Sequence, residues 1–172
     1  MIISGKGSNS SVGLIKVSAD NITIDGKETE STGIFTNAQD SATRVGSIDV
    51  SAKNNLSISN GGIQASTFSS ADGGTVTVSA GSIDIGRKGI IVSQASSTGN
   101  AGDIDVSSTG HIAITNGGGV STSTLSSGNA GSIKLSAANI EINGHDRITG
   151  IFSITGGDGN AGSVEIHATT GN

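Results

Sequence analysis

The sequence predicts an all-β protein, a right-handed parallel β-helix, and three observations support this. The apolar residues are mostly β-branched, with 23 Ile and 10 Val against 4 Leu and 3 Phe. Such side chains suit a pleated sheet and lose rotamer freedom in a helix. The sequence also repeats at a period near 28 residues, and apolar and polar residues alternate within each repeat. Repetition combined with alternation is typical of a β-solenoid.

The repeat is clearest in a Gly-Asn-Ala-Gly tract that occurs at 99–102, 128–131 and 159–162. Looser copies place the coil starts near residues 13, 46, 74, 102, 131 and 162, so each coil has about 28–33 residues. We therefore expect one β-helix segment over residues 1–172, with about five to six coils and three short strands per coil. Parallel crossovers are nearly always right-handed, which sets the expected hand. An isolated sheet or a sandwich is the alternative fold.

The first strand of each coil places an apolar residue in one inward column: Ile15, Ile48, Val76, Ile104, Ile133 and Val164. Two residues later comes a second inward column: Val17, Val50, Val78, Val106, Leu135 and Ile166. A third column is small: Ala19, Ala52, Ala80, Ser108, Ala137 and Ala168. Inward positions that recur every second residue are the pattern of a strand with one buried face.

The second strand continues the pattern with two further columns. They are Ile22, Leu56, Ile83, Ile112 and Ile140, then Ile24, Ile58, Ile85, Ile114 and Ile142. The third strand contributes Ile34, Ile63, Ile90, Val120 and Ile151. Asp-Gly or Asn-Gly pairs close the second strand at 25–26, 60–61, 116–117 and 143–144. These residue types accept the positive φ that tight corners need, so we expect positive φ there.

An outward column of the first strand gives an independent check on the register. It contains Lys16, Asp49, Thr77, Asp105, Lys134 and Glu165. Stacking would place Lys16 over Asp49, and Lys134 between Asp105 and Glu165. Opposite charges on neighbouring strands are favourable and like charges repel. The alternation of signs therefore supports the register.

The composition excludes several function classes. A net charge of −5 with only nine Lys and Arg predicts no nucleic-acid partner, because such surfaces need clustered cations. No apolar run is long enough for membrane insertion, and no signal peptide is visible. The absence of Cys excludes a disulfide scaffold and a thiolate metal site.

Both ends of the sequence fall within a coil. Ile2-Ile3-Ser4 resembles the third strand of a preceding coil, and the chain stops after the first strand of a sixth. We therefore expect a segment excised from a longer repeat protein. Solenoids need polar caps on their terminal units. Uncapped end coils would expose strand edges, which favour end-to-end self-association.

The tract at 121–137, with its relatives at 64–80 and 93–108, resembles a known repeat family. It is similar to the repeat region of filamentous-haemagglutinin-like exoproteins of bacterial two-partner secretion, of the cyanobacterial type. The resemblance implies a structural and adhesive segment of a bacterial protein that is secreted or held at the cell surface, associated with the outer membrane. With the repeat architecture, this leads us to expect a stiff stalk with a possible cell-surface glycan or protein as its partner. From the residues themselves we expect no enzymatic activity, because Asp105 is already explained by the charge column.

One corner of the coil is the candidate binding edge. The distance from the last inward residue of the second strand to the first of the third is ten, five, five, six and nine residues in successive coils. Insertions that gather on one edge of a solenoid often form its binding surface. The charged residues there are Lys27, Glu28, Glu30, Arg87, Lys88, His145, Asp146 and Arg147. A solvated corner would also tolerate insertions and charges, so the pattern leaves both interpretations open.

The sequence predicts no catalytic, cofactor-binding or metal-binding residues. One alternative is a polysaccharide-processing β-helix enzyme, whose best carboxylate cluster would be Asp103 and Asp105 with Lys134. The other is an ice-binding solenoid, but no outward Thr ladder persists from coil to coil. His111 and His167 fall on surface columns without a ligand set, and residues 156–164 depart from the calcium nonapeptide at Ala161.

Overall fold

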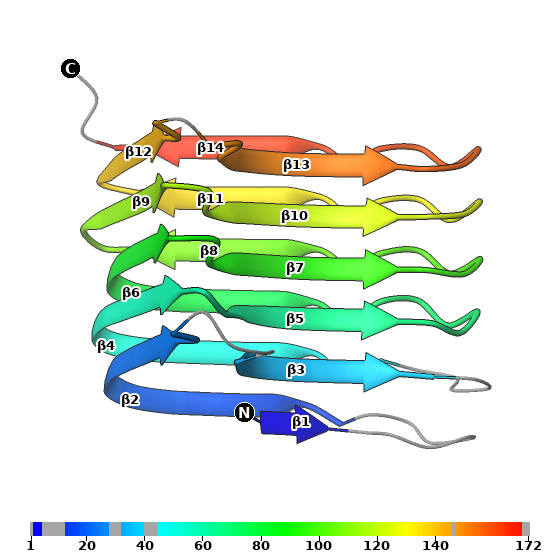
Figure 1. Ribbon diagram of the computed structural model, residues 1–172, viewed down its shortest axis with the longest axis horizontal. Helices are drawn as coiled ribbons and strands as arrows, with labels where there is room; N and C mark the ends of the chain where they lie inside the picture. The colour runs from blue at the N-terminus through cyan, green and yellow to red at the C-terminus, as the bar shows by residue number, and fades with distance from the viewer. Residues whose placement is uncertain (1, 5–12, 28–31, 40–44, 146, 170–172) are drawn as a thin grey trace.

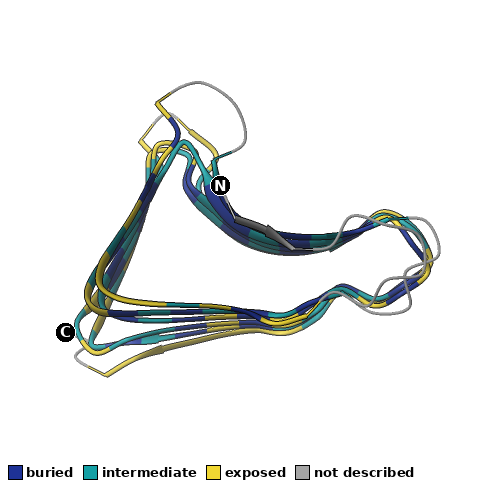
Figure 2. Cartoon of the chain, turned by 90° about the horizontal axis from the view of Figure 1, so that it is seen from below, coloured by how far each residue is buried: buried dark blue, intermediate teal, exposed yellow. Residues whose placement is uncertain are grey.

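A computed structural model of the chain, which describes residues 2–4, 13–27, 32–39, 45–145 and 147–169, confirms the β-helix (Figure 1). In Figure 1, the near strands run from left to right and the far strands return from right to left as the chain climbs towards its C-terminus. The winding is therefore right-handed, as expected. Figure 2, seen from below, shows the coils superimposed around one three-sided cross-section.

The strands form parallel ladders in which each coil pairs with the next. One sheet contains the third strands in the order β1 (Ile2–Ser4), β3 (Gly33–Ala38), β5 (Gly62–Thr67), β7 (Ile90–Ala95), β10 (Gly119–Thr124) and β13 (Gly150–Thr155). The first and second strands form the other faces: β2 (Ile15–Asp25), β4 (Ile48–Ser59), β6 (Val76–Gly86), β8 (Ile104–Ser108), β9 (His111–Thr115), β11 (Ile133–Ala137), β12 (Asn139–Asn143) and β14 (Val164–Ala168).

The expectation of three separate strands per coil is wrong for the first three coils. There the first and second strands are continuous, so β2, β4 and β6 each bend around the corner between two faces. The pairing shifts register at this bend, between Ala19 and Asn21 and again between Ala52 and Asn55. Only coils four and five break the strand there, as β8 with β9 and β11 with β12. Periodicity cannot separate a bent strand from two strands, because the inward columns are the same.

The inward columns of the first two strands pair as the sequence predicts. Ile15 pairs with Ile48, Ile48 with Val76, and the column continues to Val164. The buried Ile, Val, Leu and Ala residues form one hydrophobic core cluster from Ile15 to Ala137. Lys16 pairs with Asp49, and their charged groups lie 3.6 Å apart. Lys134 stands between Asp105 and Glu165, so the charge column is also confirmed.

The third-strand column contains one error. Ile91, and not Ile90, pairs with Ile63 and Val120 and is fully buried, whereas Ile90 points outward beside Gly62 and Gly119. A one-residue slip moves a side chain to the opposite face of a strand. Two adjacent isoleucines give no sequence signal for choosing between the two registers, and the hydrogen-bonded ladder decides.

The Gly-Asn-Ala-Gly tract forms the turn at which successive coils approach most closely. A Cβ added to Gly102, Gly131 or Gly162 would collide with the carbonyl oxygen of the glycine one coil earlier. The tract's first glycine is equally constrained, since a Cβ on Gly128 would meet the carbonyl oxygen of Gly99. Both glycines are therefore required by the spacing of the coils, which is about 4.8 Å in a parallel ladder.

Side chains fix this turn from both sides. The Oδ1 atom of Asn100 accepts a hydrogen bond from the backbone N–H of Asn129, and Asn129 accepts one from Asn160, each at 2.8 Å. From inside, buried hydroxyls of the third strands bond to the turn. Thr122 donates to the carbonyl oxygen of Gly131 at 2.6 Å, and Ser93 accepts from the N–H of Gly102 at 2.8 Å. These bonds give partners to backbone polar groups of the tight turn, as buried backbone groups in particular require.

The terminal strands continue the stack. β1 pairs with β3, with Ile2 opposite Ile34, so the expected third strand of a preceding coil is present. At the other end, Val164 and Ile166 occupy the core columns but are 45% and 47% exposed, since no further coil covers them in this structure. End-to-end association through these coils stays a prediction.

We predict that Ile112→Asp destabilises the rod severely. Ile112 is fully buried in the fourth coil, and an unpaired carboxylate there would cost about 4 kcal/mol or more. Lys88→Ala, at an exposed corner of the neighbouring coil, should change the free energy of unfolding by about 0.5 kcal/mol at most. Denaturant unfolding followed by circular dichroism measures both, and equal stability of the two variants would contradict the register.

Candidate functional site: the variable corner

The corner between the second and third strands of each coil carries the predicted binding edge. We call it the variable corner and define it as residues 26–32, 60–61, 87–89, 116–118 and 144–149. In each coil we count the residues from the last inward residue of the second strand to the first inward residue of the third. With Ile91 as the inward residue of coil three, these separations are ten, five, six, six and nine residues. By contrast, the separation from the inward residue of the third strand to the first inward residue of the next coil is 13 residues in each of coils two to five, as from Ile63 to Val76. The extra residues of coils one and five therefore fall between the second and third strands in the sequence, at the corner where the described Lys27 and His145 lie.

All six non-glycine residues with positive φ among the described residues lie at this corner: Lys27, Asn60, Arg87, Lys88, Asn116 and His145. The expectation of positive φ in the Asp-Gly and Asn-Gly pairs is thus confirmed for Asn60, Asn116 and Gly117. It is wrong in coils one and five, where the next residue, Lys27 or His145, takes the left-handed conformation. There glycine serves a different purpose, because a Cβ on Gly26 would strike the carbonyl oxygen of Asn60.

Hydrogen bonds between coils make the variable corner a continuous frame. Asn60 donates its N–H to the carbonyl oxygen of Arg87 at 2.9 Å, and Asn116 donates to that of Asn143 at 3.1 Å. The hydroxyl of Thr149 accepts from the N–H of Gly117 at 2.8 Å. A Cβ on Gly117 would lie 3.2 Å from Cδ of Arg147, so the arginine stem passes directly over that glycine. The described cations Arg87, Lys88 and Arg147 therefore project from a backbone that is hydrogen-bonded from coil to coil.

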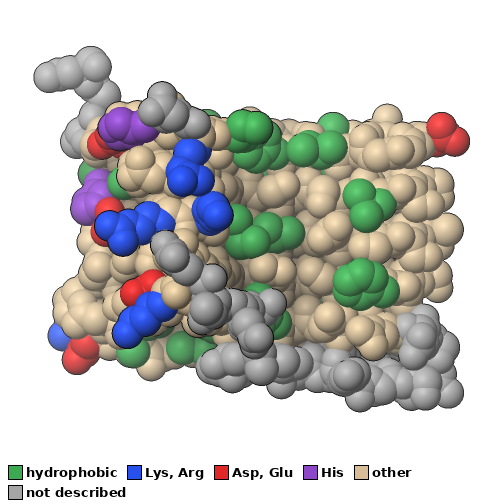
Figure 3. Space-filling model, viewed as in Figure 1, with side chains coloured by type: hydrophobic (Ala, Val, Ile, Leu, Met, Phe, Trp, Pro, Cys, Tyr) green, Lys and Arg blue, Asp and Glu red, His purple; other side chains and the backbone are tan. Residues whose placement is uncertain are grey.

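The corner concentrates positive charge. Seven Lys and Arg residues lie in the described ranges, and four of them are at this corner: Lys27, Arg87, Lys88 and Arg147. All four are exposed, and among the described residues none forms an ion pair. Figure 3 shows Lys and Arg side chains gathered near one edge of this face of the molecule. The predicted residues Glu28, Glu30 and Asp146 lie outside the described residues.

Asp25 is the described carboxylate closest in sequence to these cations, at the end of β2. Its Oδ1 atom accepts hydrogen bonds from the N–H of Lys27 and from the hydroxyl of Ser59, both at 3.2 Å. These two bonds hold the pKa of Asp25 below its ordinary value of 3.8, and the charges of Lys27 and Arg87 lower it further. The carboxylate is thus tied to the backbone of the corner.

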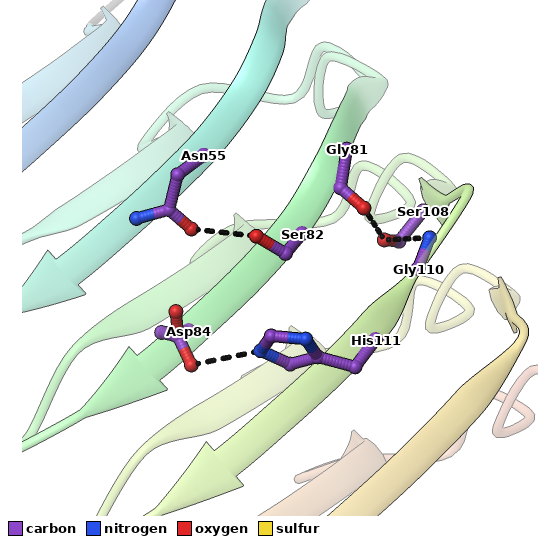
Figure 4. Close-up of polar contacts among 7 residues, drawn as sticks. All are labelled: Asn55, Gly81, Ser82, Asp84, Ser108, Gly110 and His111. Carbon is purple, nitrogen blue, oxygen red and sulfur yellow. Dashed lines mark hydrogen bonds and ion pairs between the residues drawn. The ribbon is translucent and has the colours of Figure 1, made fainter.

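The histidines occupy the positions that the sequence predicts. His111 lies in the corner column opposite Asn139, and its Nε2 is 3.3 Å from Oδ1 of Asp84 (Figure 4). His167 pairs with Ser136 in the ladder and bonds to Glu165 at 2.7 Å. That bond lowers the pKa of Glu165. His145 is exposed at the corner, and within the described ranges no group of three His, Asp or Glu could hold a metal ion.

The carboxylates of the alternative enzyme site have other partners. Asp103 accepts a hydrogen bond from the N–H of Ser132 at 2.7 Å, one coil away. Asp105 lies opposite Lys134 in the outward charge column. Both side chains therefore take part in coil stacking, and the reading of Asp103, Asp105 and Lys134 as a reactive cluster gains no support from their contacts.

Sequence reasoning missed two features of the stack. One column of the third strands, two residues after the inward Ile or Val, contains a hydroxyl in four of five coils, a spacing that was available as a signal. Its members are the buried Thr36, Ser93 and Thr122, the partly buried Ser153, and Ala65 in coil two. The second feature is the asparagine ladder, in which Asn100, Asn129 and Asn160 of successive coils are hydrogen-bonded to one another. In the sequence these residues are visible only as part of a repeated motif. The hydrogen bonds of the ladder depend on how far one turn lies above the next, which the sequence does not state.

Comparisons with protein-family models, with curated proteins and with solved structures find no match to this chain. The described part of the chain includes no helix that could span a membrane.

We predict that Ser59→Ala raises the pKa of Asp25 towards 3.8, because it removes one hydrogen bond to the carboxylate. Since the folded-state pKa is depressed, Asp25 stabilises the fold above pH 3.8, and this contribution is lost as the pH falls through the lowered pKa. Carbon-13 NMR titration of the carboxyl group measures the shift. Ser57→Ala, on the same strand without a bond to Asp25, should leave the titration unchanged.

Proposed function

We propose that this chain is a non-catalytic structural and adhesive segment of a secreted or cell-surface bacterial protein of the filamentous-haemagglutinin-like kind. It acts as a stiff stalk, and its variable corner binds an acidic partner on a cell surface, either a glycan or a protein. The observation that carries the proposal is the group of exposed cations Lys27, Arg87, Lys88 and Arg147 at this corner of a chain with a net charge of −5. Among the described residues, none of the four forms an ion pair.

The stalk role is supported by the uniform stacking of the coils. A single core cluster runs through them without interruption, and the ladder hydrogen bonds are parallel to the rod axis. Each coil contacts mainly its neighbours, so stability grows with the number of coils. A rod of this kind resists bending because bending would separate paired strands along one edge.

The adhesive role is supported by the position of the cations. Lys27 projects from the first coil, Arg87 and Lys88 from the third, and Arg147 from the fifth. Steps of two coils separate them by about 10 Å along the rod. The chain carries a net charge of −5, and the same corner also contains Glu28, Glu30 and Asp146 in its sequence, so the four cations are a local concentration of positive charge and not a wholly basic surface. A row of cations attracts an extended anionic partner, and that attraction weakens as salt screens it.

We predict that the triple variant Arg87→Ser, Lys88→Ser and Arg147→Ser loses binding to an acidic glycan on a glycan and cell-surface panel. The loss should be at least tenfold in low salt, and wild-type binding should fall at high salt. The matched control replaces Lys16, Lys53 and Lys134 by Ser, which removes the same number of charges from other faces.

The control variant should keep its binding, provided that both variants retain the wild-type circular dichroism spectrum. Equal losses in the two variants would show that net charge, and not the corner, governs binding. No binding by a folded wild-type rod would make this segment a spacer and contradict the adhesive part of the proposal.

A further inference from the structure

The sheet formed by the third strands has a composition unlike that of the other faces. None of the residues in β3, β5, β7, β10 and β13 is ionisable, although Asp, Glu, Lys, Arg or His occurs in every strand from β2 to β14 on the other faces. The outward side chains of this sheet are amides, hydroxyls and apolar groups. We call this surface the uncharged face.

The apolar groups on the uncharged face alternate from coil to coil. One outward column contains Phe35, Gln64, Val92, Ser121 and Phe152, so odd coils are apolar and even coils are polar. All five side chains are partly exposed. Like positions therefore recur every second coil, or about every 10 Å along the rod. A face that served only to keep the rod soluble would have no reason to alternate in this way.

The phenylalanines are placed outside the core. All three Phe residues of the chain lie on or beside this face, with Phe35 and Phe152 in the outward column and Phe68 53% exposed just after β5. A Cβ on Gly150 would lie 3.2 Å from Cζ of Phe152, so the ring tip lies down over that glycine. The ring is thus held against the sheet as an apolar platform.

The shape of the sheet supports an elongated ligand. Figure 2 shows the sheet curving so that its concave side faces outward. In Figure 3, scattered apolar side chains are visible over the same area, and the Lys and Arg side chains lie to one side of it. Apolar side chains beside a few hydrogen-bonding groups are the usual composition of a ligand-binding surface.

We propose that the uncharged face binds an extended, neutral β-1,4-linked polysaccharide chain that lies along the rod axis. Such a chain advances by close to one coil spacing per sugar and presents the same ring face at every second sugar. The apolar faces of alternate sugars stack on Phe152, Val92 and Phe35, as apolar rings do on aromatic platforms. The amides and hydroxyls of the intervening coils, such as Gln64 and Ser121, bond to the sugar hydroxyls.

The absence of charge on this face favours a neutral ligand over an acidic one. An acidic chain would have to leave water without gaining a cation, which is unfavourable. This inference goes beyond the variable corner and does not depend on it. The two surfaces are distinguished by salt, because stacking on apolar platforms is not screened.

The test is titration of the full chain with cellohexaose, followed by NMR and calorimetry, with maltohexaose as the control ligand. Maltohexaose has the same sugars but a curled, α-linked chain. We expect cellohexaose to shift resonances of β3, β5, β7, β10 and β13, with equal affinity at low and high salt. Phe152→Ser with Val92→Ser should weaken binding about tenfold, the size expected for losing one aromatic platform.

The matched control is Leu14→Ser, which removes an exposed apolar side chain outside these strands and should leave the affinity unchanged. The triple variant of the variable corner should also bind cellohexaose normally, which separates this proposal from the adhesive one. Failure of wild type to bind cellohexaose, or equal binding of maltohexaose, would overturn the inference. So would a concentration-dependent dimer that Phe152→Ser abolishes, because the face would then bind a second copy of the chain.

Discussion

The spacing between coils is the constraint on which the rest of this structure depends. Parallel strand pairing fixes the distance between neighbouring coils at about 4.8 Å. Each turn of one coil must therefore lie only that far from the same turn of the next coil. Where turns stack directly, as at Gly102 and Gly131, no side chain fits between one backbone and the next. The glycines of the repeated tract follow from this, and so do the asparagine ladder and the buried hydroxyls, which bond to the backbone of the same turn.

The same spacing organises the surface. Because like residues stack on like, any outward position becomes a column along the rod, and its chemistry repeats at one- or two-coil intervals. The charge column of Lys16 and Asp49, the cations of the variable corner and the platforms of the uncharged face are three such columns. A solenoid therefore offers an extended partner side chains at fixed intervals along its axis. The chemistry and the interval of these side chains determine which partner can bind.

Most of this architecture could be predicted from the sequence. Alternation located the inward columns, and the repeated tract located the coil starts, since both depend on local pattern. The choice between Ile90 and Ile91 could not be made, because either residue satisfies the alternation and only the ladder fixes the register. The bend in β4 and the left-handed conformations of Lys27 and His145 were also missed, because they are set by neighbouring coils. The variable corner was found through insertion length, whereas the uncharged face was overlooked because it is marked by an absence of charge.

The most direct test of the central claim is the free energy of unfolding of Gly131→Ala compared with Gly119→Ala. At Gly131 an added Cβ would collide with the backbone of the preceding coil, whereas at Gly119 its nearest atom would be the carbonyl oxygen of Gly150 at 3.7 Å. We expect Gly131→Ala to lose about 2 kcal/mol or more, as overpacking does, and Gly119→Ala to be neutral or slightly stabilising. Equal stability of the two variants would show that the coils do not approach as closely as this account requires.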